Sequence, residues 1–182
     1  MRRILEVASL LALAAVLAPA AAAQGAQQAA PVEISVRAEL LRQFDDASGK
    51  IVRLAEKMPA ESYGWQPMEG VRTVSQVFMH MAAGGYNYAR ALGTPLPEGV
   101  NLRELGNITA KDQVVAELKK AVEHARKALA AADLDKEINF RRRPGAAREA
   151  AIALAVHMHE HLGQAIAYAR SNKVVPPWSE GN

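Results

Sequence analysis

The stretch His157–Gln164, which reads HMHEHLGQ, is the part of the chain around which we expect the fold to be organised. It lies within a run of apolar residues that recur at alternating steps of three and four, the spacing of one face of a helix. The members of this stripe are Ala150, Leu154, His157, His161, Gln164 or Ala165, and Tyr168. A stripe of this kind faces a protein core. The sequence therefore predicts a buried helical face that carries two histidines.

The two histidines of this stripe, His157 and His161, can point at a single atom. Side chains at positions i and i+4 of a helix lie above one another on the same face. His159 lies about 160° around the helix axis from either residue, given 3.6 residues per turn, and we expect it to face elsewhere. Two buried imidazoles need polar partners, because an unpaired buried polar group costs about 1–3 kcal/mol. A shared metal ion meets that need, and hydrogen bonds within a polar core are the alternative.

The chain contains no cysteine, so any metal must be held by nitrogen or oxygen atoms. The same absence excludes a thiol nucleophile and a disulfide framework. The histidine pair also differs from the metalloprotease pattern, which places a glutamate directly after the first histidine, where this chain has Met158. Imidazole ligands suit several divalent metals. We expect zinc first, with nickel or iron as the alternatives.

The amino-terminal segment has the features of an export signal. Arg2 and Arg3 precede an apolar run, Val7–Ala23, that is rich in alanine and leucine and contains a proline. The alanines that end this run satisfy the small-residue rule of signal peptidase, so we expect residues 1–23 to be a cleaved signal peptide. The alternative is a membrane span, but the run is short for one. The sequence thus predicts an exported protein, periplasmic or secreted.

After cleavage we expect residues 24–32 to form a flexible leader and residues 33–182 to form one folded domain. Loss of the signal peptide lowers the formal net charge from +3 to +2. A charge this small and dispersed argues against a nucleic-acid partner. No stable membrane anchor is expected once the signal peptide is removed.

Four segments of the domain have helical periodicity, and long connections rich in proline and glycine separate them. The expected helices are residues 33–57, 73–92, 109–132 and 146–171. No stretch has a convincing strand pattern. The predicted fold class is therefore all-α, a four-helix bundle.

Several local signals set the expected helix ends. Thr73 and Gln76 form the pattern of a capping box, and Thr109 is expected to cap the third helix in a similar way. Asn172 is expected to end the fourth helix in the left-handed conformation. The pair Gly84–Gly85 weakens the second helix by about 1 kcal/mol per glycine, so we expect another helix or a ligand to approach it closely.

Aromatic and basic residues outside the histidine pair suggest the surroundings of a site. Trp65, with Tyr63, is expected to cover the end of the core, and the alternative is that it walls a pocket beside the metal together with Gly84 and Tyr88. His124 lies among charged residues and is expected to be exposed. The run Arg141–Arg143 before Pro-Gly is typical of a solvated loop, with anion binding as the alternative.

The chain resembles the DinB-like superfamily in segments that are spread over the whole domain. In the amino-terminal half they are Met58–Pro67, Val71–Ser75 and His80, and in the carboxy-terminal half His157–His161, Gly163–Gln164, Tyr168–Asn172 and Val175–Pro177. The chain departs from many members at Leu162, where arginine is common, and at Lys173, where glycine is common. Neither position is a ligand position.

This resemblance implies a four-helix bundle that binds a divalent metal through three histidines, His80, His157 and His161. It does not place a ligand at His159. It also implies homodimers that form through helix packing. Gln164, three residues after His161, is expected to orient a ligand ring or a bound water from outside the ligand set. Glu160, three residues after His157, is expected either to act in the same way or to be a solvated surface residue.

Three readings of function remain open from the sequence. The first is a non-catalytic module that binds a metal or a small-molecule ligand. The second is a metal-dependent hydrolase or thiol transferase, since the family includes members that use low-molecular-weight thiols. Export argues against the transferase, because reduced thiol cofactors belong to the cytosol. The third is a structural bundle without metal, in which neutral histidines form a polar core network.

Overall fold

The structure is a computed structural model, and it describes residues 35–180. The predicted signal peptide, residues 1–23, and the predicted leader, residues 24–32, lie outside the described residues, so cleavage and export stay predictions. Within the described part of the chain, no helix is long and apolar enough to span a membrane.

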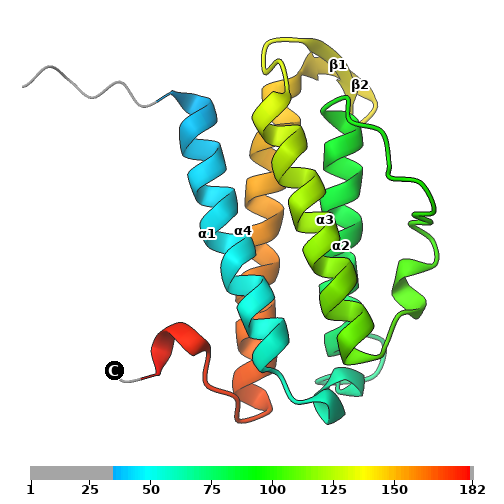
Figure 1. Ribbon diagram of the computed structural model, residues 1–182, viewed down its shortest axis with the longest axis vertical. Coiled ribbons are helices and arrows are strands. Elements are labelled where there is room, and N and C mark those ends of the chain that lie inside the picture. Colours follow the sequence, from blue (N-terminus) through cyan, green and yellow to red (C-terminus); the bar gives the residue numbers. More distant parts are fainter. Residues whose placement is uncertain (1–34, 181–182) are drawn as a thin grey trace, which may run out of the picture. The chain divides into compact units, whose positions relative to one another are not determined.

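The described residues form four long helices, as the sequence predicts, with a small β-hairpin before the last one (Figure 1). The helices are α1 (Val36–Lys57), α2 (Val74–Ala91), α3 (Lys111–Ala131) and α4 (Ala147–Ser171). The hairpin strands are β1 (Glu137–Phe140) and β2 (Arg143–Ala146). Short 3₁₀ helices lie in the connections and near the carboxyl end: η1 (Ala60–Gly64), η2 (Leu105–Asn107) and η3 (Pro177–Ser179).

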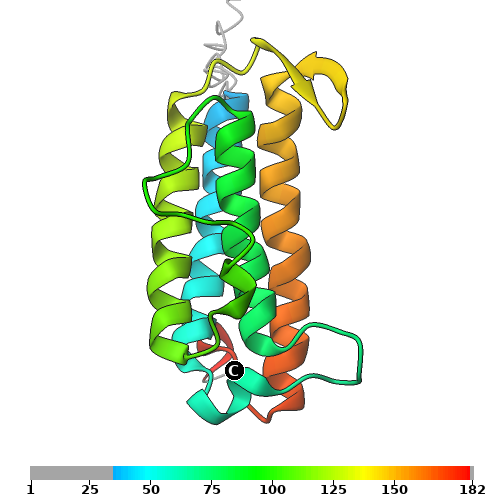
Figure 2. The ribbon, with the colours of Figure 1, turned by 90° about the vertical axis from the view of Figure 1, so that its right-hand side faces the viewer.

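Each helix of the bundle packs against two others. Both α1 and α2 pack against α3 and α4, so α1 lies diagonally across from α2. Figure 1 shows that α2 and α3 run in the same direction, opposite to α1 and α4. Because α2 and α3 are parallel, residues 92–110 must run back along the bundle before α3 begins, and Figure 2 shows this return along one side. This topology explains the length of that connection.

The bundle interior is filled by large apolar side chains from all four helices. Those that are fully buried include Phe44, Ile51, Leu54, Phe78, Met81, Tyr86, Leu118, Leu129, Leu154 and Met158. Small residues let the helices approach one another. A Cβ atom added at Gly85 would lie 3.3 Å from the carbonyl oxygen of Ala121, so α2 and α3 are close at this point. The predicted close approach at the glycine pair is therefore confirmed for Gly85.

The start of α2, the helix that carries His80, is fixed by local hydrogen bonds. The predicted capping box is confirmed: Gln76 N–H donates to Thr73 Oγ1 at 3.3 Å, and Thr73 N–H donates to Gln76 Oε1 at 3.0 Å. The preceding loop is held as well, because the buried Tyr63 hydroxyl donates to the Ala55 carbonyl at 2.6 Å. The two capping-box bonds satisfy amides that would otherwise be unpaired at the start of α2.

Three predicted helix ends were wrong. The first helix begins at Val36 rather than residue 33, because the Ser35 side chain accepts from the Ala38 N–H at 3.1 Å. The cap position of α3 is Ala110, which makes no side-chain cap, so Thr109 lies one residue too early to cap it. At the end of α4, Lys173 has the left-handed conformation (φ 60°), whereas Asn172 has φ −90°. The side-chain amide of Asn172 donates to the Tyr168 carbonyl at 2.8 Å.

The absence of strands was also predicted wrongly. Strands β1 and β2 pair antiparallel, with Phe140 opposite Arg143, so the loop between them has only two residues. Arg141 and Arg142 both have positive φ, 52° and 65°. This turn type favours Asn-Gly or Asp-Gly, and a left-handed residue with a Cβ costs about 1–2 kcal/mol. The usual hairpin signal is therefore missing from the sequence, and four-residue strands are too short to show a clear alternation.

We expect Thr73→Ala to lower the free energy of unfolding by about 1 kcal/mol, because it removes the side chain that caps α2. Thr109→Ala is the matched control, since Thr109 does not cap α3, and we expect a change below about 0.5 kcal/mol. Urea denaturation of both variants measures the difference. Equal losses in the two variants would contradict the assignment of the caps.

Candidate metal centre

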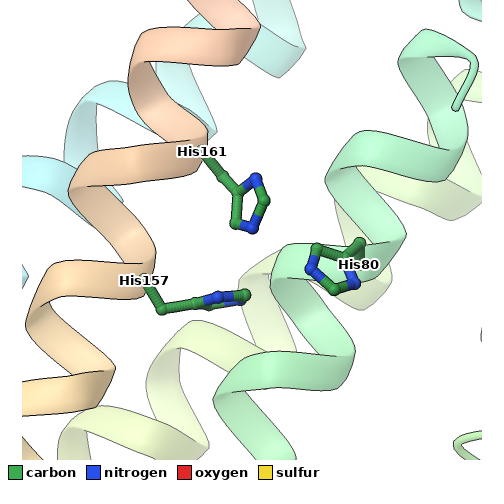
Figure 3. A group of neighbouring side chains, drawn as sticks. All are labelled: His80, His157 and His161. Atoms are coloured by element: carbon green, nitrogen blue, oxygen red, sulfur yellow. The ribbon is translucent and has the colours of Figure 1, made fainter. Parts of the chain in front are cut away.

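Three imidazole rings from two helices converge inside the bundle. His157 and His161 lie on successive turns of α4 and reach toward His80 of α2 (Figure 3). Each ring offers one nitrogen, and these three nitrogens lie within 4.8 Å of one another. The ring centroid of His80 lies 5.1 Å from that of His157 and 4.6 Å from that of His161. Antiparallel packing of α2 on α4 thus brings together residues far apart in sequence.

Gly84, one turn after His80 on α2, makes room for the His157 ring. A Cβ atom at this position would lie 2.6 Å from His157 Cδ2 and would overlap Nε2. Any side chain at residue 84 would therefore push the ring away from the other two histidines. Gly84 was predicted to line a pocket, and its role is to let His157 reach the cluster.

The Nε2 atom of His157 is buried and has no hydrogen-bond partner among the described residues. An unpaired buried polar atom of this kind costs about 1–3 kcal/mol, so buried polar groups in native proteins have partners with few exceptions. A metal ion bound through this nitrogen and through the other two rings would give it a partner. The residues present therefore fit a divalent metal, with nitrogen ligands only.

Burial keeps two of the rings neutral. It lowers the pKa of His80 to about 4, with a smaller effect from the charge of Arg72. Burial also lowers the pKa of His157 to about 4, aided by the neighbouring His161. Both rings are therefore unprotonated at neutral pH, and an unprotonated imidazole has the lone pair that a metal ligand requires.

Gln164 orients the third ring. Its Oε1 atom lies 2.9 Å from Nδ1 of His161. A carboxamide oxygen can only accept, so this contact makes Nδ1 the protonated nitrogen and leaves Nε2 of His161 for a metal. Glu160 makes no such hydrogen bond and is exposed. Of the two residues predicted to support the ligands, Gln164 is the one with a hydrogen bond to a ligand ring among residues 35–180.

The other two histidines lie away from the cluster. His159 is exposed and lines a shallow groove with Leu40 and Gln43 of α1, in agreement with the helical-wheel prediction. His124 on α3 was predicted to be exposed, and this is wrong. Its Nε2 atom is buried, and its ring lies 5.5 Å from that of Tyr86. Its charged sequence neighbours were a misleading signal, because a helix places adjacent residues on different faces.

An open cavity of about 340 Å³ lies beside His157. Tyr88, which sequence analysis assigned to a pocket, lines it, as does Glu160. Trp65 does not: it packs edge-on against Tyr168, with ring centroids 5.3 Å apart, and covers the end of the bundle. Arg141 and Arg143 of the hairpin and Glu149 of α4 supply the remaining charged groups of the wall.

Sequence reasoning missed the contribution of Phe140, which stands on the hairpin and lines the same cavity. The signal that could have found it was the basic run that directly follows. The run was interpreted as a solvated loop because no strand was expected on either side of it. A hairpin in that position folds the loop back over α4.

Fold and site together define a four-helix bundle with a histidine cluster between its second and fourth helices. The family model of the DinB superfamily matches residues 43–166, which is more than half of the chain. The chain belongs to the DinB superfamily. A comparison with curated proteins finds no match.

Solved structures of two DinB-like proteins have the same fold. One, from Bacillus cereus, is 17% identical to this chain with a TM-score of 0.66, over 76% of this chain and 93% of that one. The other, from Bacillus subtilis, is 21% identical with a TM-score of 0.60, over 75% of this chain and 93% of that one. Similarity at this level of identity shows the fold alone.

In the absence of metal, we expect acid to destabilise the protein through His80 and His157. Their folded pKa of about 4 lies below the value of about 6.5 in an unfolded chain. Between these values the unfolded chain takes up protons that the folded protein does not, so stability falls as pH drops from 6.5 to 4. Urea denaturation with chelator at several pH values measures this effect.

The reference for this experiment is the double variant His80→Gln, His157→Gln. We expect the wild-type protein to lose about 2 kcal/mol more than this variant between pH 7 and pH 4, a value reduced for solvent screening. The exposed His159→Gln is the matched control and should behave as wild type. Parallel pH profiles for wild type and the double variant would show that the two rings are not held neutral by burial.

Proposed function

We propose that the protein binds one divalent transition-metal ion through His80, His157 and His161. The observation that carries this proposal is the convergence of three histidine rings, each with one nitrogen within 4.8 Å of the other two. In addition, the Nε2 atom of His157 is buried without a hydrogen-bond partner among the described residues. Zinc is the first candidate because it accepts three imidazoles readily, and nickel or iron are next. A structural bundle without metal is disfavoured, since it would leave His157 Nε2 unsatisfied.

The proposed role is that of an exported metal-binding or ligand-binding module. Three protein ligands leave a metal with open positions, which water or a small molecule can occupy. The cavity beside His157 gives a small molecule access to that side of the cluster. Export is supported by the basic residues and the apolar run at the start of the chain, and an exported protein would meet its ligand outside the cytosol.

A metal-dependent hydrolase is the second candidate. The observation that favours it is Glu160, whose exposed carboxylate lines the cavity next to His157 and is of the chemical type that acts as a general base. A metal with open positions supplies Lewis-acid chemistry in such a site. A thiol transferase is the weaker enzymatic alternative, because expected export separates the protein from reduced cytosolic thiols.

Metal analysis of the purified protein tests the proposal. We expect about one equivalent of divalent metal in the wild-type protein, and a loss of more than about 100-fold in affinity for His80→Ala or His157→Ala, since a lost outer partner already costs 10–100-fold. His159→Ala is the matched control and should retain the metal. Equal affinity in all four proteins, or no metal in any, would contradict the proposed site.

Turnover separates the module from the hydrolase. The wild-type protein is assayed against a panel of simple ester and amide substrates, with and without chelator. Chelator-sensitive turnover that Glu160→Gln lowers by about 100-fold would establish the hydrolase, since general-base catalysis contributes 10²–10⁴-fold. Metal binding without turnover would favour the module.

We further expect Gly84→Ala to weaken metal binding by about tenfold or more, because the new methyl group would occupy the place of the His157 ring. Gly163→Ala is the matched control: this exposed glycine lies between His161 and Gln164, and a Cβ there would meet nothing within 4 Å. Competition of each protein with a chromogenic chelator measures the affinity. If Gly84→Ala binds metal as tightly as Gly163→Ala, His157 is not a ligand in the orientation seen here.

A further inference from the structure

The two-residue loop of the hairpin holds arginines where the backbone favours glycine or asparagine. Arg141 and Arg142 have φ values of 52° and 65°, and the flanking residues Phe140 and Arg143 are paired. Backbone strain of this kind gathers at ligand-binding sites, where the surrounding structure maintains it. The basic side chains of this loop are therefore candidates for a role that the metal cluster alone does not explain.

A line of aromatic contacts connects this loop with the histidine cluster. The guanidinium carbon of Arg141 lies 5.2 Å from the centre of the Phe140 ring. The Phe140 ring is 6.2 Å from Tyr88, and the Tyr88 ring is 5.6 Å from His157. All four residues line the cavity of about 340 Å³ described above, a size within the range of small-molecule sites. Arg141 is thus at one end of the cavity wall and His157 at the other.

The two arginines that line the cavity differ in their partners. Arg143 forms an ion pair with Glu149, and Glu149 Oε1 also accepts from the Ala146 N–H at 3.2 Å, which ties the hairpin to the start of α4. Arg141 forms no ion pair with any residue in the described range 35–180. A guanidinium that lies over an aromatic ring and has no ion-pair partner keeps N–H donors available to an anion.

The charges of the cavity favour an anion once a metal is bound. Arg143 and Glu149 neutralise each other, which leaves Arg141 and Glu160 as the remaining charged lining groups. The positive charge of Arg141 and the negative charge of Glu160 also cancel. A divalent cation on the histidines makes the cavity net positive. The apolar part of the wall, Phe140 and Tyr88, suits a ligand with an aromatic or aliphatic body.

We propose that this cavity binds a small organic anion, a carboxylate or a phosphate monoester, whose charged group is held by Arg141. Its body packs against Phe140 and Tyr88, and its far end faces the metal at His157. The proposal rests on the proposed metal site, because the bound cation supplies the net positive charge. It names the ligand class of that site, and Arg141 as the residue that selects for negative charge.

Calorimetric titration with matched probes tests the proposal. The metal-loaded protein is titrated with 4-hydroxybenzoate, with its neutral amide 4-hydroxybenzamide, and with phenyl phosphate. The variants are Arg141→Asn and Arg142→Asn, since asparagine tolerates positive φ and keeps the hairpin while it removes the charge. Arg142 is the matched control because it shares the strained turn but does not line the cavity.

We expect the anions to bind the wild-type protein at least tenfold more tightly than the amide, with phenyl phosphate and 4-hydroxybenzoate showing which anionic group is preferred. Arg141→Asn should weaken anion binding by about tenfold or more, and Arg142→Asn by less than twofold. Both variants should melt at a temperature equal to or above that of wild type, because both relieve backbone strain. If Arg141 only supports the hairpin, Arg141→Asn will change the melting temperature and leave the preference for the anions over the amide unchanged.

Three results would overturn the proposal: no anion binding to the metal-loaded protein, equal binding of acid and amide, or equal weakening in the two arginine variants. Metal content is measured on every sample before titration. A protein that holds metal but fails these tests contradicts the anion site alone. A protein that holds no metal contradicts the proposed function, and titration of that metal-free protein with the same probes then decides whether Arg141 selects anions without a cation.

Discussion

The close packing of α2 against α4 is the constraint on which the rest of the structure depends. The His157 ring reaches His80 only because residue 84, one turn further along α2, has no side chain, so that the ring occupies the space a Cβ would fill. The capping box at Thr73 fixes where α2 begins, and with it the turn of the helix that carries His80. Burial of the cluster follows from this contact, and burial in turn keeps His80 and His157 unprotonated.

The same packing explains how one end of the bundle becomes a site. The hairpin between α3 and α4 folds over the cavity beside His157, and the ion pair of Arg143 with Glu149 holds it there. Protein surfaces that combine a polar cluster, an aromatic wall and a charged rim are typical of small-molecule sites. A bundle core formed from alanine and large aliphatic side chains gives this site a rigid support, which a constellation of ligands needs if it is to keep its geometry.

Periodicity alone predicted the four helices and the inward face of α4, because a long amphipathic helix repeats its signal over several turns. The i, i+4 spacing also predicted that His157 and His161 share a face and that His159 does not. The assignment of His80 as a third member came from family resemblance, since spacing along one helix cannot tell which residue of another helix lies opposite. The hairpin and the half-buried His124 were missed because both depend on tertiary contacts. The cap of α3 was missed because the helix begins one residue later than the sequence predicts.

X-ray absorption at the metal edge tests the central claim most directly, because it reports the atoms bound to the ion without requiring knowledge of a substrate. For the zinc-loaded protein the account predicts three imidazole nitrogens at about 2.0–2.1 Å, with oxygen ligands in the remaining positions. Loss of one imidazole from the spectrum of His80→Ala would agree with this assignment. A spectrum of the wild-type protein without imidazole scattering, or with only two imidazoles, would contradict it.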